Sequence, residues 1–360
     1  MPFFEAQCQR CRNDFPSLKR MVNGQPLAYF DGPGGTQVPQ QVIYAVSDYY
    51  QRYNANADGA FVTSLETDQM VHQARQTVAA FLGAPSWREI SFGANMTTLT
   101  FAMSHALGRV MEPGDEIVIT ELDHEANRGP WLNLQGQGIV VKEVALRPDG
   151  TLDPEDMARQ ISKRTRLVAI GYSANSLGTV NDLALARRLA RDVGALLLVD
   201  AVHYAPHFPL DVVALDADFL LCSAYKFYGP HVGVLYARPG LLEQFQTDKL
   251  RSHSDEAPYC VETGTPNFAC IAGAKAAVEY LASWGEGADL RARLVRTMED
   301  IGAYEHELAR TCFEGVTSIP GVTVWGPGFQ SHRRAPTVSI TIDGLHPRDA
   351  ARRLAEQGIA

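Results

Sequence analysis

The sequence lacks a long apolar run, a basic cluster and an abundance of cysteine. A membrane-spanning helix needs about 20 consecutive apolar residues, and no stretch of this chain approaches that length. The net charge is −9 without a basic run, so we expect neither nucleic acid nor a membrane as a partner. Six cysteines in 360 residues do not predict a disulfide framework. The N-terminal residues show no secretory pattern, and we expect a cytoplasmic protein.

Metal chemistry also lacks support. Cys8 and Cys11 form the one CxxC of the sequence. No second CxxC or Cys/His pair completes a zinc site, and no thioredoxin-like pattern surrounds the motif. We interpret the pair as ordinary thiols on a helix and predict no metal site.

The composition is that of a globular protein, with 46% hydrophobic and 20% charged residues. The length allows a large core and a second, smaller domain. Residues 166–172 are typical of a strand, 182–193 of a helix and 195–199 of a buried strand. Strand, helix and strand in this order predict a parallel sheet.

Two further elements are predicted later in the chain. Residues 232–236 are typical of a strand, and they follow Lys226 too closely for a helical crossover. We therefore predict that this strand runs antiparallel to its neighbour. Residues 241–250 are predicted to be helical.

Two strand ends carry residues with chemical potential. Lys226 follows the apolar run 218–222, and Asp200 closes the buried strand 195–199. In open α/β sheets, ligands bind at the carboxyl ends of the strands. Burial lowers the pKa of a lysine, which makes its amine a nucleophile. A lysine and a carboxylate facing one crevice are what pyridoxal phosphate requires, because the cofactor needs an amine for its aldehyde and an acid for its ring nitrogen.

The order of the motifs is similar to that of fold-type I pyridoxal phosphate enzymes, specifically the class V aminotransferase and cysteine desulfurase group. The matching segments are residues 29–35, 123–127, 173–178, 200–203, 223–226 and 262–267. The resemblance implies a three-layer α/β/α large domain with a mostly parallel seven-stranded sheet, and a small α/β C-terminal domain. We expect an N-terminal arm at 1–28 packing with the small domain, a large domain at 29–265 and the small domain at 266–360.

The resemblance also implies the roles of individual residues. Lys226 is expected to hold the cofactor as an aldimine and to move the Cα proton, Asp200 to pair with the pyridine nitrogen, and His124 to stack on the ring and relay protons. The residues expected to bind the cofactor are Ala94, Asn95, Met96, Thr97, His124, Asn175, Asp200, His203, Ser223, Tyr225, Lys226 and Thr265.

Thr265 is expected to act across a subunit boundary. In the resembled family, the segment that matches residues 262–267 completes the phosphate site of the neighbouring subunit. The resemblance therefore implies a homodimer with shared active sites.

The reaction stays open between several uses of the same cofactor on an amino acid. Desulfuration, transamination, epimerisation and C–S lysis all begin with Cα deprotonation, and a catalytically idle binding protein is the alternative from another class. In the family, the arginine that binds the substrate carboxylate and the persulfide-forming cysteine follow the point that matches Ala360. Of the cysteines present, Cys260 alone is predicted to lie on a loop that approaches a site, and we interpret it as structural. We therefore expect little cysteine desulfurase turnover from these 360 residues.

Overall fold

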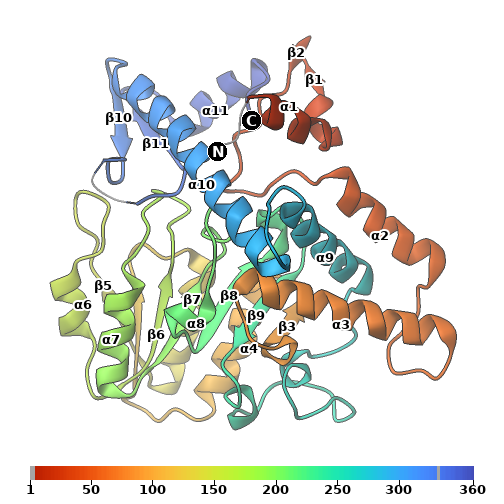
Figure 1. Ribbon diagram of the computed structural model, residues 1–360. Helices are drawn as coiled ribbons and strands as arrows, with labels where there is room; N and C mark the ends of the chain where they lie inside the picture. Colours follow the sequence, from red (N-terminus) through yellow and green to blue (C-terminus); the bar gives the residue numbers. More distant parts are fainter. Residues whose placement is uncertain (1–4, 331–332) are drawn as a thin grey trace.

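The computed structural model describes residues 5–330 and 333–360, so that residues 1–4 of the predicted arm lie outside the described part. A seven-stranded sheet with the order β3-β9-β8-β7-β6-β4-β5 forms its centre (Figure 1). The strands are β3 (Ile90–Gly93), β4 (Glu116–Thr120), β5 (Val140–Val144), β6 (Thr165–Gly171), β7 (Leu196–Asp200), β8 (Phe219–Ser223) and β9 (Gly233–Ala237). β4 to β8 pair in parallel, whereas β9 is antiparallel to β3 and β8. Both the mostly parallel sheet and the antiparallel strand after Lys226 are thus confirmed.

Helices cover the sheet and connect its strands. The α-helices are α1 (Glu5–Asn13), α2 (Gln40–Arg52), α3 (Val62–Leu82), α4 (Met96–Gly108), α5 (Gly129–Leu132), α6 (Pro154–Gln160), α7 (Leu183–Val193), α8 (Val212–Leu215), α9 (Phe268–Ala282), α10 (Leu290–Thr317) and α11 (Pro347–Glu356). The 3-10 helices are η1 (Pro16–Lys19), η2 (Trp87–Glu89), η3 (Glu125–Asn127), η4 (Asn133–Gln137), η5 (Ala224–Lys226), η6 (Leu242–Gln244) and η7 (Tyr259–Val261). None of the helices in the described ranges is long and apolar enough to cross a membrane.

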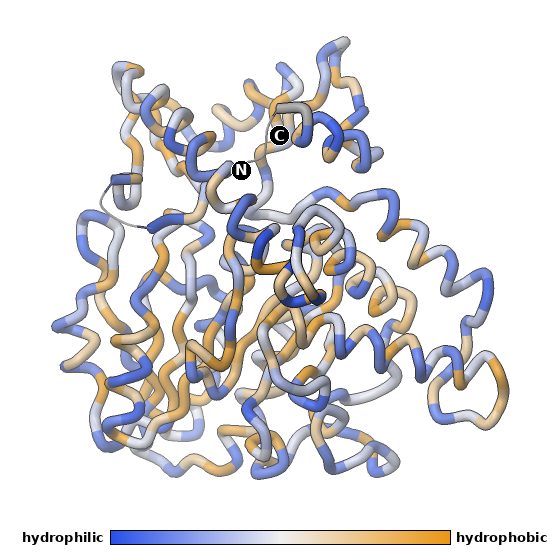
Figure 2. Tube along the Cα trace, viewed as in Figure 1, coloured by the Kyte–Doolittle hydropathy of each residue, from blue (hydrophilic) through white to orange (hydrophobic). Residues whose placement is uncertain are grey.

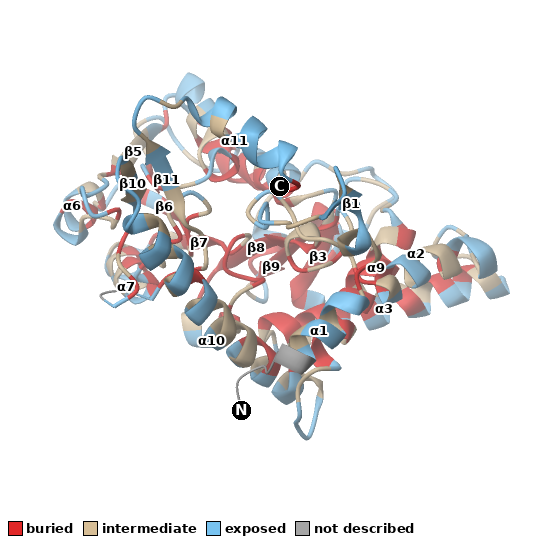
Figure 3. Cartoon of the chain, turned by 90° about the horizontal axis from the view of Figure 1, so that it is seen from above, coloured by how far each residue is buried: buried red, intermediate tan, exposed pale blue. Residues whose placement is uncertain are grey.

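The two faces of the sheet pack into two separate apolar cores. Successive residues of a strand point to opposite faces. In β7, Leu197 and Val199 enter one core, which also holds residues of α3, α7 and α9, while Leu198 enters the other with residues of α4. Because both faces are covered, the central strands are continuous apolar runs. Figure 2 shows this apolar character along the strands, and Figure 3 shows the buried residues at the centre of the molecule.

Smaller elements lie beyond the end of the sheet where the parallel strands finish (Figure 1). They include the hairpin of β1 (Met21–Val22) and β2 (Gln25–Pro26), and the antiparallel pair of β10 (Val322–Trp325) and β11 (Ser339–Ile342). The N-terminal segment meets the last residues of the chain here, since Ala28 pairs with Ile359 and the Ala360 N–H donates to Ala28 O at 2.9 Å.

The predicted helix at 241–250 is wrong. Only the three residues of η6 are helical, and Phe245 is already extended, with φ −114° and ψ 139°. Leu242 is buried, the Phe245 ring packs against Phe219 at 6.3 Å between centroids, and the Thr247 hydroxyl donates to Cys260 O. These contacts hold the segment extended along the core, so tertiary packing overrides the local helical preference.

Candidate active site

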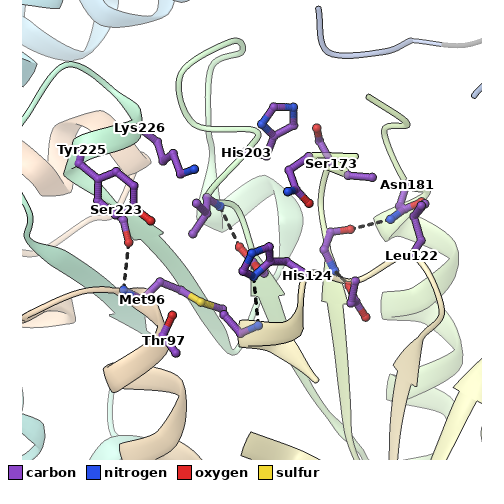
Figure 4. Close-up of a pocket in the computed structure, with 17 residues that line it drawn as sticks. Met96, Thr97, Leu122, His124, Ser173, Asn181, His203, Ser223, Tyr225 and Lys226 are labelled. Atoms are coloured by element: carbon purple, nitrogen blue, oxygen red, sulfur yellow. Dashed lines mark hydrogen bonds between the residues drawn. The ribbon is translucent and has the colours of Figure 1, made fainter. Parts of the chain in front are cut away.

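A pocket lies at the carboxyl edge of the sheet, where four parallel strands end (Figure 4). The segments after β4, β6, β7 and β8 each contribute polar side chains to its wall. Parallel strands place their carboxyl ends on one edge, which explains why residues far apart in sequence meet here. The pocket-lining residues with polar side chains are Thr97, Asp123, His124, Ser173, Asn175, Asn181, Asp200, His203, Ser223, Tyr225 and Lys226.

Lys226 ends η5 and lies in the pocket against the loop at residues 32–35. Its Nζ donates to Pro33 O and lies 5.1 Å from the centroid of the Tyr225 ring. The loop is held there because Thr36 N donates to Tyr225 O at 2.9 Å. A Cβ at Gly35 would lie 3.3 Å from the Tyr225 ring, so the close approach favours glycine. Burial lowers the pKa of Lys226, although Asp31 and Asp200 act in the opposite direction.

Two buried carboxylates, those of Asp123 and Asp200, line the pocket. Asp200 is 7% exposed, and its Oδ1 accepts from Val202 N at 2.9 Å. Burial raises the pKa of Asp200, while His124 and Lys226 partly offset this effect. Asp123 accepts from Gly171 N at 2.5 Å and from Thr120 N at 2.8 Å. Burial, with a contribution from the charge of Asp200, raises the pKa of Asp123 to about 7.

His124 is oriented by its own backbone. The residue caps η3, and its Nδ1 accepts from Ala126 N at 3.0 Å. An Nδ1 that accepts this hydrogen bond leaves Nε2 as the ring nitrogen that can donate one. His124 therefore presents a donor nitrogen from a fixed ring at the pocket wall (Figure 4).

His203 is tied to a distant segment. It is 6% exposed, and its Nε2 lies 2.9 Å from Thr337 Oγ1. Its ring meets that of His207 edge-on at 5.1 Å, and His207 Nδ1 lies 2.8 Å from Glu305 Oε2 on α10. Burial lowers the pKa of His203 well below its usual value, so the ring is neutral at physiological pH.

The start of α4 reaches the pocket from the side of β8. Met96 N donates to Ser223 Oγ at 2.9 Å, and Asn95 Oδ1 accepts from Thr98 N at 2.9 Å as a helix cap. The Thr97 N–H and hydroxyl bond to no other described residue, and Thr97 lines the pocket. A helix start with an unengaged N–H and hydroxyl suits an anion. A Cβ at Gly233 would lie 2.4 Å from the Asn95 carbonyl carbon, so the glycine allows β9 to approach this helix start.

The structure brings most of the predicted site residues together, with three exceptions. Met96, Thr97, His124, Asn175, Asp200, His203, Ser223, Tyr225 and Lys226 all line this pocket. Asn95 does not line it and caps α4 instead. Ala94 and Thr265 line a different pocket, whose wall also includes Thr98 of α4.

The segment that carries Thr265 is held by a buried ion pair. Glu262 Oε2 lies 2.8 Å from Arg75 Nη2, and its Oε1 accepts from Phe92 N at 2.7 Å. The side chains of Arg75 and Glu262 are 2% and 7% exposed. Removing one partner of such a pair would leave a buried, unpaired charge, which is costly. The ion pair therefore anchors the segment against β3.

Sequence reasoning assigned no role to several residues that matter for this site. Asp123, Ser173 and Asn181 line the pocket. Asp123 comes three residues after the end of β4, and Ser173 comes two residues after the end of β6. This position shortly after a buried strand is the signal that identifies them. Thr337, the partner of His203, lies 134 residues away in sequence and has no such signal.

The comparisons with known proteins agree with this geometry. The profile of the aminotransferase class-V family matches residues 28–360. The chain belongs to the class-V aminotransferase family. The class-V enzyme is 37% identical to "Probable cysteine desulfurase" of Streptomyces coelicolor, covering 97% of this chain and 85% of the relative. It is 35% identical to the cysteine desulfurase of Serratia proteamaculans, covering 98% and 87% of the two chains.

The fold comparison gives the same answer. The apo structure of the cysteine desulfurase from Thermococcus onnurineus NA1 matches with a TM-score of 0.87 and 29% identity, over 98% of this chain and 86% of that one. The class-V enzyme is thus a cysteine desulfurase-like enzyme of fold type I, and its cofactor is pyridoxal 5′-phosphate.

The pocket fits this cofactor on chemical grounds. It offers a lysine whose pKa is lowered, a buried carboxylate for a ring nitrogen, and unengaged donors at a helix start for a phosphate. It also holds the buried Ser173 hydroxyl, which has no hydrogen-bond partner. An amine, an acid and unsatisfied donors in one cavity are the groups that pyridoxal phosphate requires.

Proposed function

We propose that the class-V enzyme binds pyridoxal 5′-phosphate in the pocket around Lys226 and acts there on the Cα of an amino acid. The observation that carries the proposal is the presence of Lys226 and Asp200 in one pocket, each just after or at the end of a parallel strand. When bound, the cofactor withdraws electrons from the bonds of the substrate Cα. Lys226 is the residue that would hold the cofactor, and Asp200 would face its ring nitrogen.

Lys226 is also proposed as the base that takes the Cα proton and returns it. A base must be neutral before it can accept a proton, and burial lowers the pKa of this amine toward physiological pH. The backbone carbonyl of Pro33, which accepts from Nζ, orients the amine toward the side of the loop at residues 32–35. We propose that the substrate enters beside this loop.

The two histidines are proposed to hold the ring in place. His124 has a fixed ring orientation with Nε2 as its donor, which suits stacking and proton relay. His203 is neutral and buried, so it contacts the bound group as a hydrogen-bonding residue and adds no charge. Asn175 adds an amide to the same wall.

Cysteine is the first substrate to test, because the relatives are named as cysteine desulfurases. None of the six cysteines, all of which lie in the described ranges, lines the pocket with Lys226. Cys260 is 3% exposed, and burial raises its pKa to about 11. A buried thiol with a raised pKa is a poor nucleophile. We therefore expect slow sulfur transfer to a thiol of this 360-residue chain.

An amino-acid screen in D₂O tests the proposal. We expect the holoenzyme to exchange the Cα proton of its substrate for deuterium, seen by NMR, since Lys226 can take and return that proton. We expect sulfide release from L-cysteine, with reductant, to stay below about 1 per second. Lys142→Ala, which removes a lysine outside the pocket, serves as the control with unchanged exchange. An unchanged exchange rate in Lys226→Ala would contradict the proposal.

We also propose that the class-V enzyme is a homodimer in which Thr265 reaches the phosphate of the other subunit. In its own chain, Thr265 lies outside the Lys226 pocket. Large apolar side chains on and near α2 and α3 are exposed, namely Tyr44, Tyr50, Phe61, Val62 and Leu65. Exposed apolar surface of this extent marks an interaction face.

We propose the cytoplasm as the compartment of the class-V enzyme, because its six cysteines are free thiols.

Mixed subunits test the shared site. A heterodimer of a Lys226→Ala chain with a Thr265→Ala chain places both defects in one site and leaves the other site intact. We therefore expect the mixture to recover activity that neither homodimer shows, up to about one quarter of the wild-type value per subunit when the chains exchange at random. Sedimentation as a monomer with cofactor bound, or the absence of recovery after verified exchange, would refute the arrangement.

A further inference from the structure

The Ser173 hydroxyl is buried in the pocket without a hydrogen-bond partner. Ser173 is 6% exposed, and its Oγ bonds to no other group. Ser173 lines the pocket together with Asp200. His203 lines it as well (Figure 4). Among the described residues with a buried, unpartnered side-chain polar atom, it is the one that lines this pocket. An unsatisfied buried polar group in a native fold calls for an explanation, and a ligand is one of the few available.

The backbone around Ser173 is fixed on both sides. Tyr172 N donates to Asp200 O at 2.8 Å, and Ala174 N donates to Thr179 O at 2.8 Å. Ser173 itself pairs with Val180 in an antiparallel bridge. The position of the side chain is therefore set by the sheet edge, and only its one torsion, with three staggered states, is adjustable. The hydroxyl can therefore reach a ligand by a change of that one torsion, without movement of the backbone.

We propose that Ser173 is a further cofactor-contacting residue, whose hydroxyl donates a hydrogen bond to an oxygen of the bound pyridoxal phosphate. The inference rests on the proposed location of the cofactor in this pocket. Ser173 and Asn175 both line this pocket, as do Asp200 and His203. The hydroxyl is buried and unpartnered in the free protein, so it gains a partner when its side chain turns toward a ligand in the pocket that Ser173 lines.

This role predicts that Ser173→Ala affects cofactor binding but not the stability of the free protein. The free protein loses no hydrogen bond, so its melting temperature stays unchanged or rises. The holoenzyme loses a donor, so the dissociation constant for pyridoxal phosphate rises by about tenfold. The pH dependence of the absorption of the bound cofactor also shifts, because an oxygen that loses a donor holds its proton more tightly. A merely structural serine would produce the opposite pattern.

Two variants complete the test. Ser91 is buried outside the pocket, and its Oγ donates to Pro258 O at 2.8 Å. Ser91→Ala should lower the melting temperature and leave cofactor affinity unchanged. Ser173→Thr keeps the hydroxyl and should retain cofactor affinity better than Ser173→Ala.

Two results would overturn the role of Ser173. One is wild-type affinity and an unshifted absorption titration in Ser173→Ala. The other is a fall in the stability of the free Ser173→Ala protein as large as that in Ser91→Ala. Failure of the proposed function is a separate result, because the wild-type protein itself would then not bind pyridoxal phosphate at Lys226.

Discussion

Lys226→Ala is expected to lower turnover by about a thousandfold or more while leaving the fold intact. The variant loses both the amine that would hold the cofactor and the base for the Cα proton. It loses little structure, because the one hydrogen bond that Nζ makes to the described residues is to Pro33 O. Steady-state turnover and thermal melting of the variant measure the two effects separately.

Two other lysine variants sharpen this prediction. Lys226→Arg keeps the positive charge but is not a nucleophile at neutral pH, so it should be as inactive as Lys226→Ala. Lys142→Ala removes a lysine with 26% side-chain exposure that pairs with Glu116 far from the pocket, and its turnover should stay near wild type. Activity retained in Lys226→Arg would show that the charge of the side chain, and not its amine, is what matters.

Asp200→Asn is expected to lower turnover by about a hundredfold or more and to weaken cofactor binding. An amide cannot hold the proton of a pyridine nitrogen, so the bound ring withdraws electrons less strongly. The fold should persist, because an asparagine Oδ1 can still accept from Val202 N. Measuring turnover, cofactor affinity and melting temperature of Asp200→Asn against wild type tests this prediction.

The direction of the pKa shift predicts how this variant responds to pH. Burial raises the pKa of Asp200 in the free protein. Stability from this group is present at low pH and is lost as pH rises through the raised pKa, because its anion is buried. Asp200→Asn removes that loss, so the free variant should be at least as stable as wild type at neutral pH. A large fall in the stability of the free variant, with near-normal turnover, would contradict the proposed role.

The main site residues could be predicted because they follow buried strands. Asp200 comes directly after one apolar run and Lys226 comes shortly after another, and the parallel sheet then brings both to one edge. The contact of His203 with Thr337 could not be predicted, since it depends on how a segment 134 residues away returns to the pocket. The missing partner of Ser173 is likewise a property of packing that no local pattern shows.

Local pattern also failed where tertiary contacts decide the backbone. Residues 241–250 are predicted to be helical, yet the helix ends at Gln244, where Leu242 is buried and the Phe245 ring packs against Phe219. At the start of α4, small and hydroxyl residues predicted a cofactor site at 94–97. The Asn95 side chain caps the helix and Met96 and Thr97 line the pocket, so cofactor binding by this segment stays a prediction.

Borohydride reduction of the holoenzyme, followed by peptide mapping, tests the central claim most directly. Reduction fixes pyridoxal phosphate permanently to the amine that holds it. The account predicts one modified peptide, carrying the cofactor on Lys226, and no modification in the Lys226→Ala protein treated in the same way. Stoichiometric labelling of another lysine, or an equally labelled Lys226→Ala protein, would contradict it.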